Sequence, residues 1–232
     1  MMTQPIDAVL LDMDGTILNS IAVAERIWGE WAGRHGLDVP SFIPTIHGMQ
    51  AIETIRRLAL PQVDPETEAA TITQLELDDV DGIKAITGAS EFLAALANYR
   101  WAIVTSAPRA LALRRIRAAG LPEPPLLIAA EDVEQGKPAP DCFLLAAARL
   151  GTTADKCLVM EDSPAGIKAA ERAGARLLVV TETHHQPMES THPLISNYLE
   201  LSLEQTADGA TWIRRINAPT AIAYLLQPAA SK

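Results

Sequence analysis

Short apolar segments alternate with amphipathic, alanine-rich segments along the second half of this 232-residue chain. The apolar segments predict strands at 8–12, 101–105, 126–130, 157–161 and 177–180. The amphipathic segments predict helices at 90–98, 110–119, 142–150 and 165–173. Apolar runs separated by helices are typical of parallel strands that are covered on both faces. We therefore predict an α/β fold built on a doubly wound parallel sheet.

The segment 18–88 departs from this alternation. It carries helical patterns such as SIAVAERIWGEWAGRHG and no convincing strand, so we predict a small all-helical cap inserted after the first strand. Residues 1–17 and 89–215 would then form the core, with a tail of unknown role at 216–232. Past Thr183 the patterns weaken, and we predict a surface loop at 184–192. The histidines of this loop, 184, 185 and 192, fit no usual zinc spacing.

Composition narrows the class of protein. With 48% hydrophobic residues the chain can bury a sizeable core, and the formal net charge of -10 argues against nucleic acid or anionic membranes as partners. No apolar run reaches the roughly 18 residues of a membrane span, and the N-terminus lacks a signal-peptide pattern. Cys142 and Cys157 follow no disulfide or zinc spacing. We expect a monomeric cytoplasmic protein whose partner is a small molecule.

Polar residues follow several of the predicted strands. The four segments concerned contribute Asp12 and Asp14, Thr105 and Ser106, Lys137 in EQGKPAPD, and Glu161 and Asp162. Ligands of open α/β sheets bind beyond the carboxyl ends of the strands, so these side chains are predicted to meet at one site.

The chemistry of that site follows from the residue types. Neighbouring carboxylates repel each other unless a cation lies among them, and the hard oxygen ligands of Asp12 and Asp162 suit Mg²⁺. A carboxylate is also a competent nucleophile toward phosphorus. Lys137 and Thr105 would neutralise charge on the transferring phosphoryl oxygens. Asp14 would act first as general acid and then as base for the attacking water.

The segments DMDGTILNS, VTS, GKPAPD and EDSPAG, in this order, resemble the four motifs of the haloacid dehalogenase superfamily. The resemblance runs from Asp12 to about Gly174 and implies a Rossmann-like core with a small helical cap. It implies Asp12 as nucleophile, Asp14 as acid and base whose backbone carbonyl also binds Mg²⁺, and Asp162 as a metal ligand. Thr105 and Lys137 would bind the phosphoryl group, and Glu161 would orient a metal-bound water.

Placement of the cap before the second motif is similar to a subfamily that contains sugar phosphatases, glycerol-3-phosphatases, 2-deoxyglucose-6-phosphatases and β-phosphoglucomutase. The segments IHG and VTSAPR are most similar to the bacterial sugar (hexitol) phosphatases of that group. The resemblance therefore implies a Mg²⁺-dependent phosphatase that acts on small phosphomonoesters such as sugar or polyol phosphates. The sequence does not specify which of them.

Departures from family patterns separate the alternatives. True dehalogenases lack a carboxylate at the position of Asp14. Relatives of β-phosphoglucomutase carry a histidine where this chain has Ala24 and an arginine where it has Ala51, so hydrolysis is favoured over mutase action. A phosphoryl-accepting receiver domain places its aspartate on a later strand and has no helical insert after the first strand. Chain order therefore disfavours a signalling role.

Four residues are candidates for substrate binding. Thr105 and Ser106 precede a predicted helix and could be its N-cap pair, and amides at a helix N-terminus also bind phosphate. His47 lies in a predicted cap loop, and Arg109 follows Thr105 by four residues. For each of these two side chains the sequence leaves two alternatives, contact with the substrate or a solvated position.

Overall fold

A six-stranded sheet lies at the centre of the computed structural model, which describes residues 5–184, 186–207, 209–216 and 223–228. Its strands, in spatial order, are β6 (Leu127–Ile128), β5 (Trp101–Val104), β2 (Ala8–Leu11), β7 (Cys157–Glu161), β8 (Arg176–Val180) and β9 (Leu194–Ile195). Every neighbouring pair is parallel. The predicted doubly wound parallel sheet is confirmed. The sheet gains β9 from a region where the sequence pattern had weakened.

Alternate residues of the central strands enter two separate apolar clusters. Ala8 and Leu10 of β2 join the cluster that contains α7 (Asp141–Arg149) and α8 (Pro164–Ala173). Val9 and Leu11 join the opposite cluster, with α5 (Ala89–Ala95) and α6 (Arg109–Ala118). Burial on both faces explains why β2 is apolar throughout rather than alternating with polar residues.

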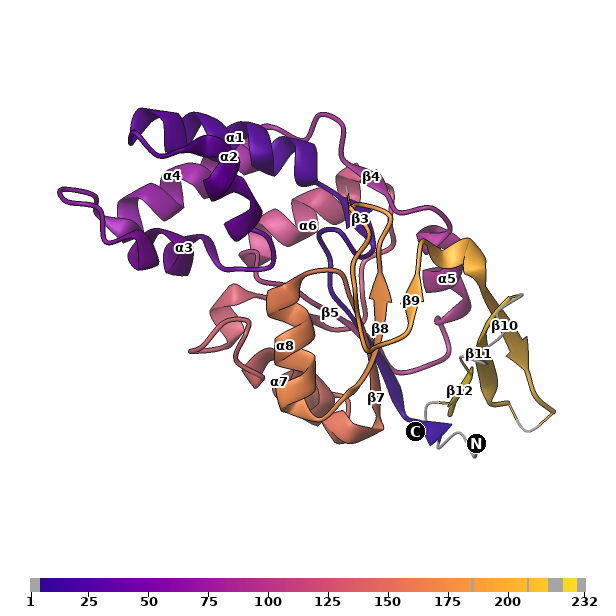
Figure 1. Ribbon diagram of the computed structural model, residues 1–232. Coiled ribbons are helices and arrows are strands. Elements are labelled where there is room, and N and C mark those ends of the chain that lie inside the picture. The colour runs from indigo at the N-terminus through magenta and orange to yellow at the C-terminus, as the bar shows by residue number, and fades with distance from the viewer. Residues whose placement is uncertain (1–4, 185, 208, 217–222, 229–232) are drawn as a thin grey trace.

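The segment after β2 forms a group of helices beside one end of the sheet (Figure 1). The group consists of α1 (Ile21–Arg34), α2 (Val39–Phe42), η1 (Ile43–Thr45), α3 (Ala51–Leu58) and α4 (Pro65–Asp78). Two short strands, β3 (Leu18–Asn19) and β4 (Lys84–Ala85), pair antiparallel where the chain leaves the core and returns. The expectation of helices alone is therefore wrong for these two linkers. They lie next to each other, and their backbone amides and carbonyls form hydrogen bonds by pairing as strands.

Local sequence explains how the helices of this group begin and pack. Asp64 caps α4 by accepting a hydrogen bond from the Thr67 backbone amide, and proline occupies the first helical position. The rings of Trp28, Trp31 and Phe42 pack with centroids 5.6 to 5.9 Å apart. The helical group therefore has an aromatic centre, which belongs to the same apolar cluster as Val9 and Leu11 of the sheet.

A second sheet contains the chain segments nearest both termini. Its order is β1 (Pro5–Ile6), β12 (Ala223–Leu226), β11 (Thr211–Arg215) and β10 (Leu201–Gln205). β1 and β12 are parallel and the other pairs are antiparallel. The segment predicted as a tail thus contributes a strand, while its residues 217–222 and 229–232 lie outside the described residues.

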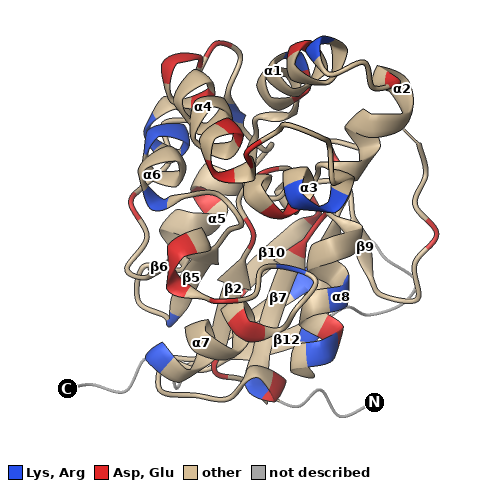
Figure 2. Ribbon diagram, turned by 90° about the vertical axis from the view of Figure 1, so that its left-hand side faces the viewer, with Lys and Arg blue, Asp and Glu red and all other residues tan. Residues whose placement is uncertain are grey.

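Three further short helical turns complete the described elements: η2 (Ala130–Asp132), η3 (Ala154–Lys156) and η4 (Tyr198–Glu200). Basic and acidic positions are interspersed over the helices in Figure 2. Within the described ranges, no helix has the length and apolar character needed to cross a membrane.

Candidate active site

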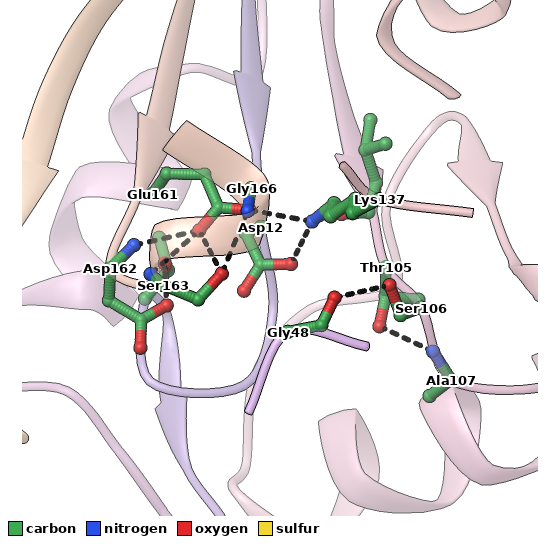
Figure 3. Close-up of polar contacts among 12 residues, drawn as sticks. Asp12, Gly48, Thr105, Ser106, Ala107, Lys137, Glu161, Asp162, Ser163 and Gly166 are labelled. Carbon is green, nitrogen blue, oxygen red and sulfur yellow. Dashed lines mark hydrogen bonds and ion pairs between the residues drawn. The ribbon is translucent and has the colours of Figure 1, made fainter. Parts of the chain in front are cut away.

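Asp12 follows β2 directly and is only 5% exposed. The Lys137 ammonium group donates hydrogen bonds to Asp12 Oδ1, to Glu161 Oε1 at 2.7 Å and to the Val104 carbonyl at 3.1 Å (Figure 3). Lys137 is itself 1% exposed, so its charge acts in a site with little water. Three neighbouring segments of the sheet are therefore tied together by one buried cation.

Glu161 organises the turn that follows β7. Its Oε2 accepts hydrogen bonds from the backbone amides of Asp162 and Ser163, at 2.9 and 3.0 Å, and from the Ser163 hydroxyl. A Cβ at Gly166 would lie 1.6 Å from Glu161 Oε1, so glycine is what lets α8 approach this carboxylate. Every described contact of Glu161 positions Lys137 or this turn.

Asp162 lies opposite the loop that follows β2. Its Oδ1 accepts a hydrogen bond from the Thr16 hydroxyl at 2.9 Å, and a Cβ at Gly15 would lie 2.0 Å from its Oδ2. Gly15 also has a φ of +89°, a conformation that favours glycine. These two features hold Asp162 close to the turn that carries Asp14.

The carboxylates of Asp12, Glu161 and Asp162 are buried, with one oxygen from each lying within 4.8 Å of the others. Burial and the charge of Glu161 raise the pKa of Asp12 to about 7, although Lys137 lowers it. Burial, Glu161 and Asp12 raise the pKa of Asp162 well above its usual value. Burial lowers the pKa of Lys137, but Asp12 and Glu161 outweigh it and the net change is upward. The single positive charge of Lys137 does not balance the negative charges of these three carboxylates. A divalent cation that prefers oxygen ligands fits these carboxylates.

Asp14 faces a different set of partners. Its Oδ1 accepts a hydrogen bond from the Ser20 hydroxyl and lies 3.0 Å from Arg115 Nη1. Arg115 comes from α6 and is 5% exposed, and its Nη2 lies 3.1 Å from Oε1 of Glu76 in α4. Asp14 is therefore linked through one arginine to a cap helix.

A cavity of about 90 Å³ lies between the cap and the carboxyl ends of the strands. Its walls include six residues predicted for the site: Asp12, Asp14, His47, Thr105, Ser106 and Asp162. Lys137 is not among the described residues that line the cavity, but it contacts Asp12, as Figure 3 shows. The Ser106 hydroxyl donates to the Gly48 carbonyl of a cap loop at 2.9 Å, and Thr105 Oγ1 accepts from the Ala107 amide. The cap therefore closes directly over the predicted phosphate site.

The remaining predicted residues have other surroundings. Arg109 forms an ion pair with Asp132 and donates to the Leu127 carbonyl, and the described residues that line the cavity do not include it. His47 lines the cavity and lies 3.5 Å from Glu25. The loop histidines do not gather among the described residues, since His184 contacts the Asp162 carbonyl and His192 contacts Glu171. His185 lies outside the described residues.

Sequence reasoning missed two charged residues that line the cavity, Arg115 and Glu76. Arg115 shares the buried face of α6 with Leu111, Ala112 and Ile116, and Glu76 follows buried Ile72 by one helical turn. A charged residue at an apolar position of an amphipathic helix was the available signal.

This geometry agrees with the comparison to known proteins. Residues 6–174 match the haloacid dehalogenase-like hydrolase family, so the chain belongs to this family and is an enzyme of the hydrolase class. The predicted resemblance is confirmed.

Several relatives are similar over most of their length. Hexitol phosphatase A of Escherichia coli is 37% identical over 195 residues, covering 82% of this chain and 90% of that protein. A fructose-1-phosphate phosphatase of the same organism is 31% identical over 175 residues, which cover 72% of this chain and 92% of that protein. The crystal structure of a hydrolase from Pseudomonas syringae matches with a TM-score of 0.70 and 27% identity. The match covers 78% of this chain and 87% of that one.

Proposed function

We propose that this protein is a Mg²⁺-dependent phosphatase that hydrolyses small phosphomonoesters, in particular sugar or polyol phosphates, through an aspartyl-phosphate on Asp12. The observation that carries the proposal is the buried Asp12 carboxylate, which is paired with Lys137 and lines a cavity under the cap. The similarity to hexitol and fructose-1-phosphate phosphatases supports this class of substrate.

In the first step an Asp12 carboxylate oxygen attacks phosphorus and the bond to the leaving oxygen breaks. Lys137 lies within hydrogen-bond reach of Asp12, and Thr105 faces the same cavity, so both would offset charge on the phosphoryl oxygens. Asp14 donates a proton to the leaving alkoxide, which departs as a neutral alcohol.

In the second step the ionised Asp14 takes a proton from water, and that water oxygen attacks phosphorus. The phosphorus–oxygen bond to Asp12 breaks, which releases inorganic phosphate and restores the carboxylate. The same group can act in both steps because Asp14 lines the cavity and lies two residues beyond Asp12 in the chain.

Asp12 and Asp162 would hold Mg²⁺ with their carboxylates, together with the Asp14 carbonyl. The metal, when bound, supplies positive charge to the transferring phosphoryl group. Glu161 lies against Lys137 and the Asp162 amide, so we assign it to positioning this pair rather than to contact with substrate.

Mutase action would require the cap to hold a second phosphate during reorientation. Ala24 and Ala51 both line the cavity and offer no cation for that purpose. We therefore propose that water, rather than a second sugar hydroxyl, receives the phosphoryl group.

We also propose that the enzyme acts as a monomer in the cytoplasm on a phosphorylated metabolite. Light scattering would test the oligomeric state.

The test is multiple turnover on fructose, sorbitol, 2-deoxyglucose and glycerol phosphates, followed by free-phosphate release with Mg²⁺ and with chelator. Asp12→Asn is the control, because a carboxamide is a poor nucleophile but its oxygen can still accept the hydrogen bond of Lys137. We expect release that requires both Mg²⁺ and Asp12. Full activity in chelator, or retained turnover in Asp12→Asn, would contradict the mechanism.

Glucose 1-phosphate, followed by phosphorus NMR with and without a bisphosphate primer, separates the alternatives. Phosphate release without accumulation of an isomer is expected. Glucose 6-phosphate appearing faster than phosphate would establish a mutase instead, and a single phosphorylation without turnover would establish a receiver.

A further inference from the structure

Two charged side chains face the cavity from opposite sides of the cap boundary. Glu76 belongs to the last turn of α4 in the cap, and Arg115 belongs to α6 in the core. Both line the cavity that Asp12 and Asp14 also line. Figure 2 shows α4 and α6 next to each other, with acidic positions on α4 and basic positions on α6.

Both side chains are nearly inaccessible to solvent, with 6% of Glu76 and 5% of Arg115 exposed. Burial of a charged pair contributes little net stability compared with apolar residues of similar size, so stability alone does not explain the pair. Thr73, one helical turn before Glu76, also lines the cavity. The cap therefore presents polar side chains of α4 to the space above Asp12.

The hydrogen-bonding capacity of Arg115 is not fully used within the described part of the chain. Its Nη1 pairs with Asp14, while Nη2 lies 3.1 Å from Glu76 without hydrogen-bond geometry. Nη2 and Nε have no hydrogen-bond partner among the described residues. Buried donors of this kind are uncommon in proteins, and an external polar group is one explanation for them.

We propose that Glu76 and Arg115 recognise hydroxyl groups of the alcohol part of the substrate and so select polyhydroxylated phosphomonoesters. The inference rests on the proposed phosphatase function and names the residues that choose its substrate. A hydroxyl is both donor and acceptor, so one group on the substrate can donate to the Glu76 carboxylate and accept from the Arg115 guanidinium.

The balance of charges favours a neutral leaving group. Arg115 already faces two carboxylates, Asp14 and Glu76, so the pair offers little attraction to a second phosphate. Hydroxyl groups, by contrast, satisfy the buried carboxylate and guanidinium without adding charge. A leaving group with no hydroxyl besides its ester oxygen would offer Glu76 and Arg115 no hydrogen-bond partner, and sites of this kind discriminate strongly against such analogues.

The test compares two substrates in Glu76→Gln: the best sugar or polyol phosphate of the panel above, and p-nitrophenyl phosphate, which has no hydroxyl groups. We expect kcat/KM for the polyol phosphate to fall about tenfold or more, mainly through KM, and that for p-nitrophenyl phosphate to stay within about threefold. Glu76→Asp keeps the negative charge but shortens the side chain by one methylene, which withdraws the carboxylate from the cavity, and it should show the same selective loss.

Glu66→Gln is the matched control, because Glu66 lies on the same helix with its side chain 59% exposed. It should leave both substrates unchanged, and circular dichroism should show folded protein for every variant. Equal losses on both substrates in the Glu76 variants, or no loss on the polyol phosphate, would overturn the inference. Hydrolysis of p-nitrophenyl phosphate alone by the wild type would overturn it and leave the phosphatase proposal standing. No hydrolysis of either substrate would overturn both.

Discussion

Lys137 is the residue on which the electrostatics of the site depend. It is buried between Asp12 and Glu161 and is the one lysine in contact with this pair among the described residues. Its ammonium group would offset charge that develops on the phosphoryl oxygens in a site where water does not screen it.

We expect Lys137→Ala to lower kcat/KM for phosphate release by about a hundredfold or more, since one charge-stabilising group contributes several kcal/mol. Steady-state kinetics at saturating Mg²⁺ measure the effect. Lys168→Ala, an exposed lysine on α8, is the control and should leave the kinetics unchanged. A loss below about tenfold for Lys137→Ala would rule out its proposed role.

Asp14 has two proposed roles, which a change of leaving group separates. p-Nitrophenolate departs without protonation, so Asp14→Asn should still form the aspartyl-phosphate from p-nitrophenyl phosphate. Water would then lack its base, and the second step should slow. Stopped-flow absorbance should show one rapid turnover per active site followed by a slow phase. An unchanged steady rate would contradict the role of Asp14 as base.

At the scale of the element, the close approach of α8 to β7 positions the carboxylate that holds Lys137. A side chain at Gly166 would collide with the Glu161 carboxylate, and Glu161 is also held by the Asp162 and Ser163 amides. The helix and the buried ion pair are therefore mutually dependent.

Gly166→Ala should lower the free energy of unfolding by about 1–3 kcal/mol, the usual range for overpacking, and reduce phosphate release. Gly33→Ala is the control, because a Cβ at Gly33 of α1 would contact nothing within 4 Å and alanine is the better helix former. Urea unfolding of both variants checks the prediction. Wild-type stability and turnover in Gly166→Ala would show that the turn rearranges without consequence.

At the scale of the whole molecule, the proposed binding of Mg²⁺ by Asp12 and Asp162 would link stability to metal concentration. Mg²⁺ that binds only the folded chain should raise the midpoint of thermal unfolding, by the equivalent of about 2.7 kcal/mol at a hundred times the dissociation constant. Chelator should abolish the rise. Asp162→Asn should weaken it, because it removes one negative ligand, and an unchanged response would exclude Asp162 as a ligand.

Much of the fold and site could be read from local patterns. Apolar runs such as Ala8 to Leu11 specify strands buried on both faces, and polar residues that end parallel strands must lie at one edge of the sheet. This rule is why Asp12, Asp162 and Thr105, far apart in the chain, could be placed together in advance and do line one cavity.

Only the tertiary structure decided where the cap meets the core. Arg109 and Arg115 lie on the same helix, yet Arg109 pairs with Asp132 while Arg115 reaches Asp14 and Glu76. The helical period places Arg115, and not Arg109, on the buried face of α6, but only the packing of α4 against α6 brings Glu76 to it. The pairing of β1 with β12 also required the tertiary structure, because these short strands come from distant parts of the chain and leave little local pattern.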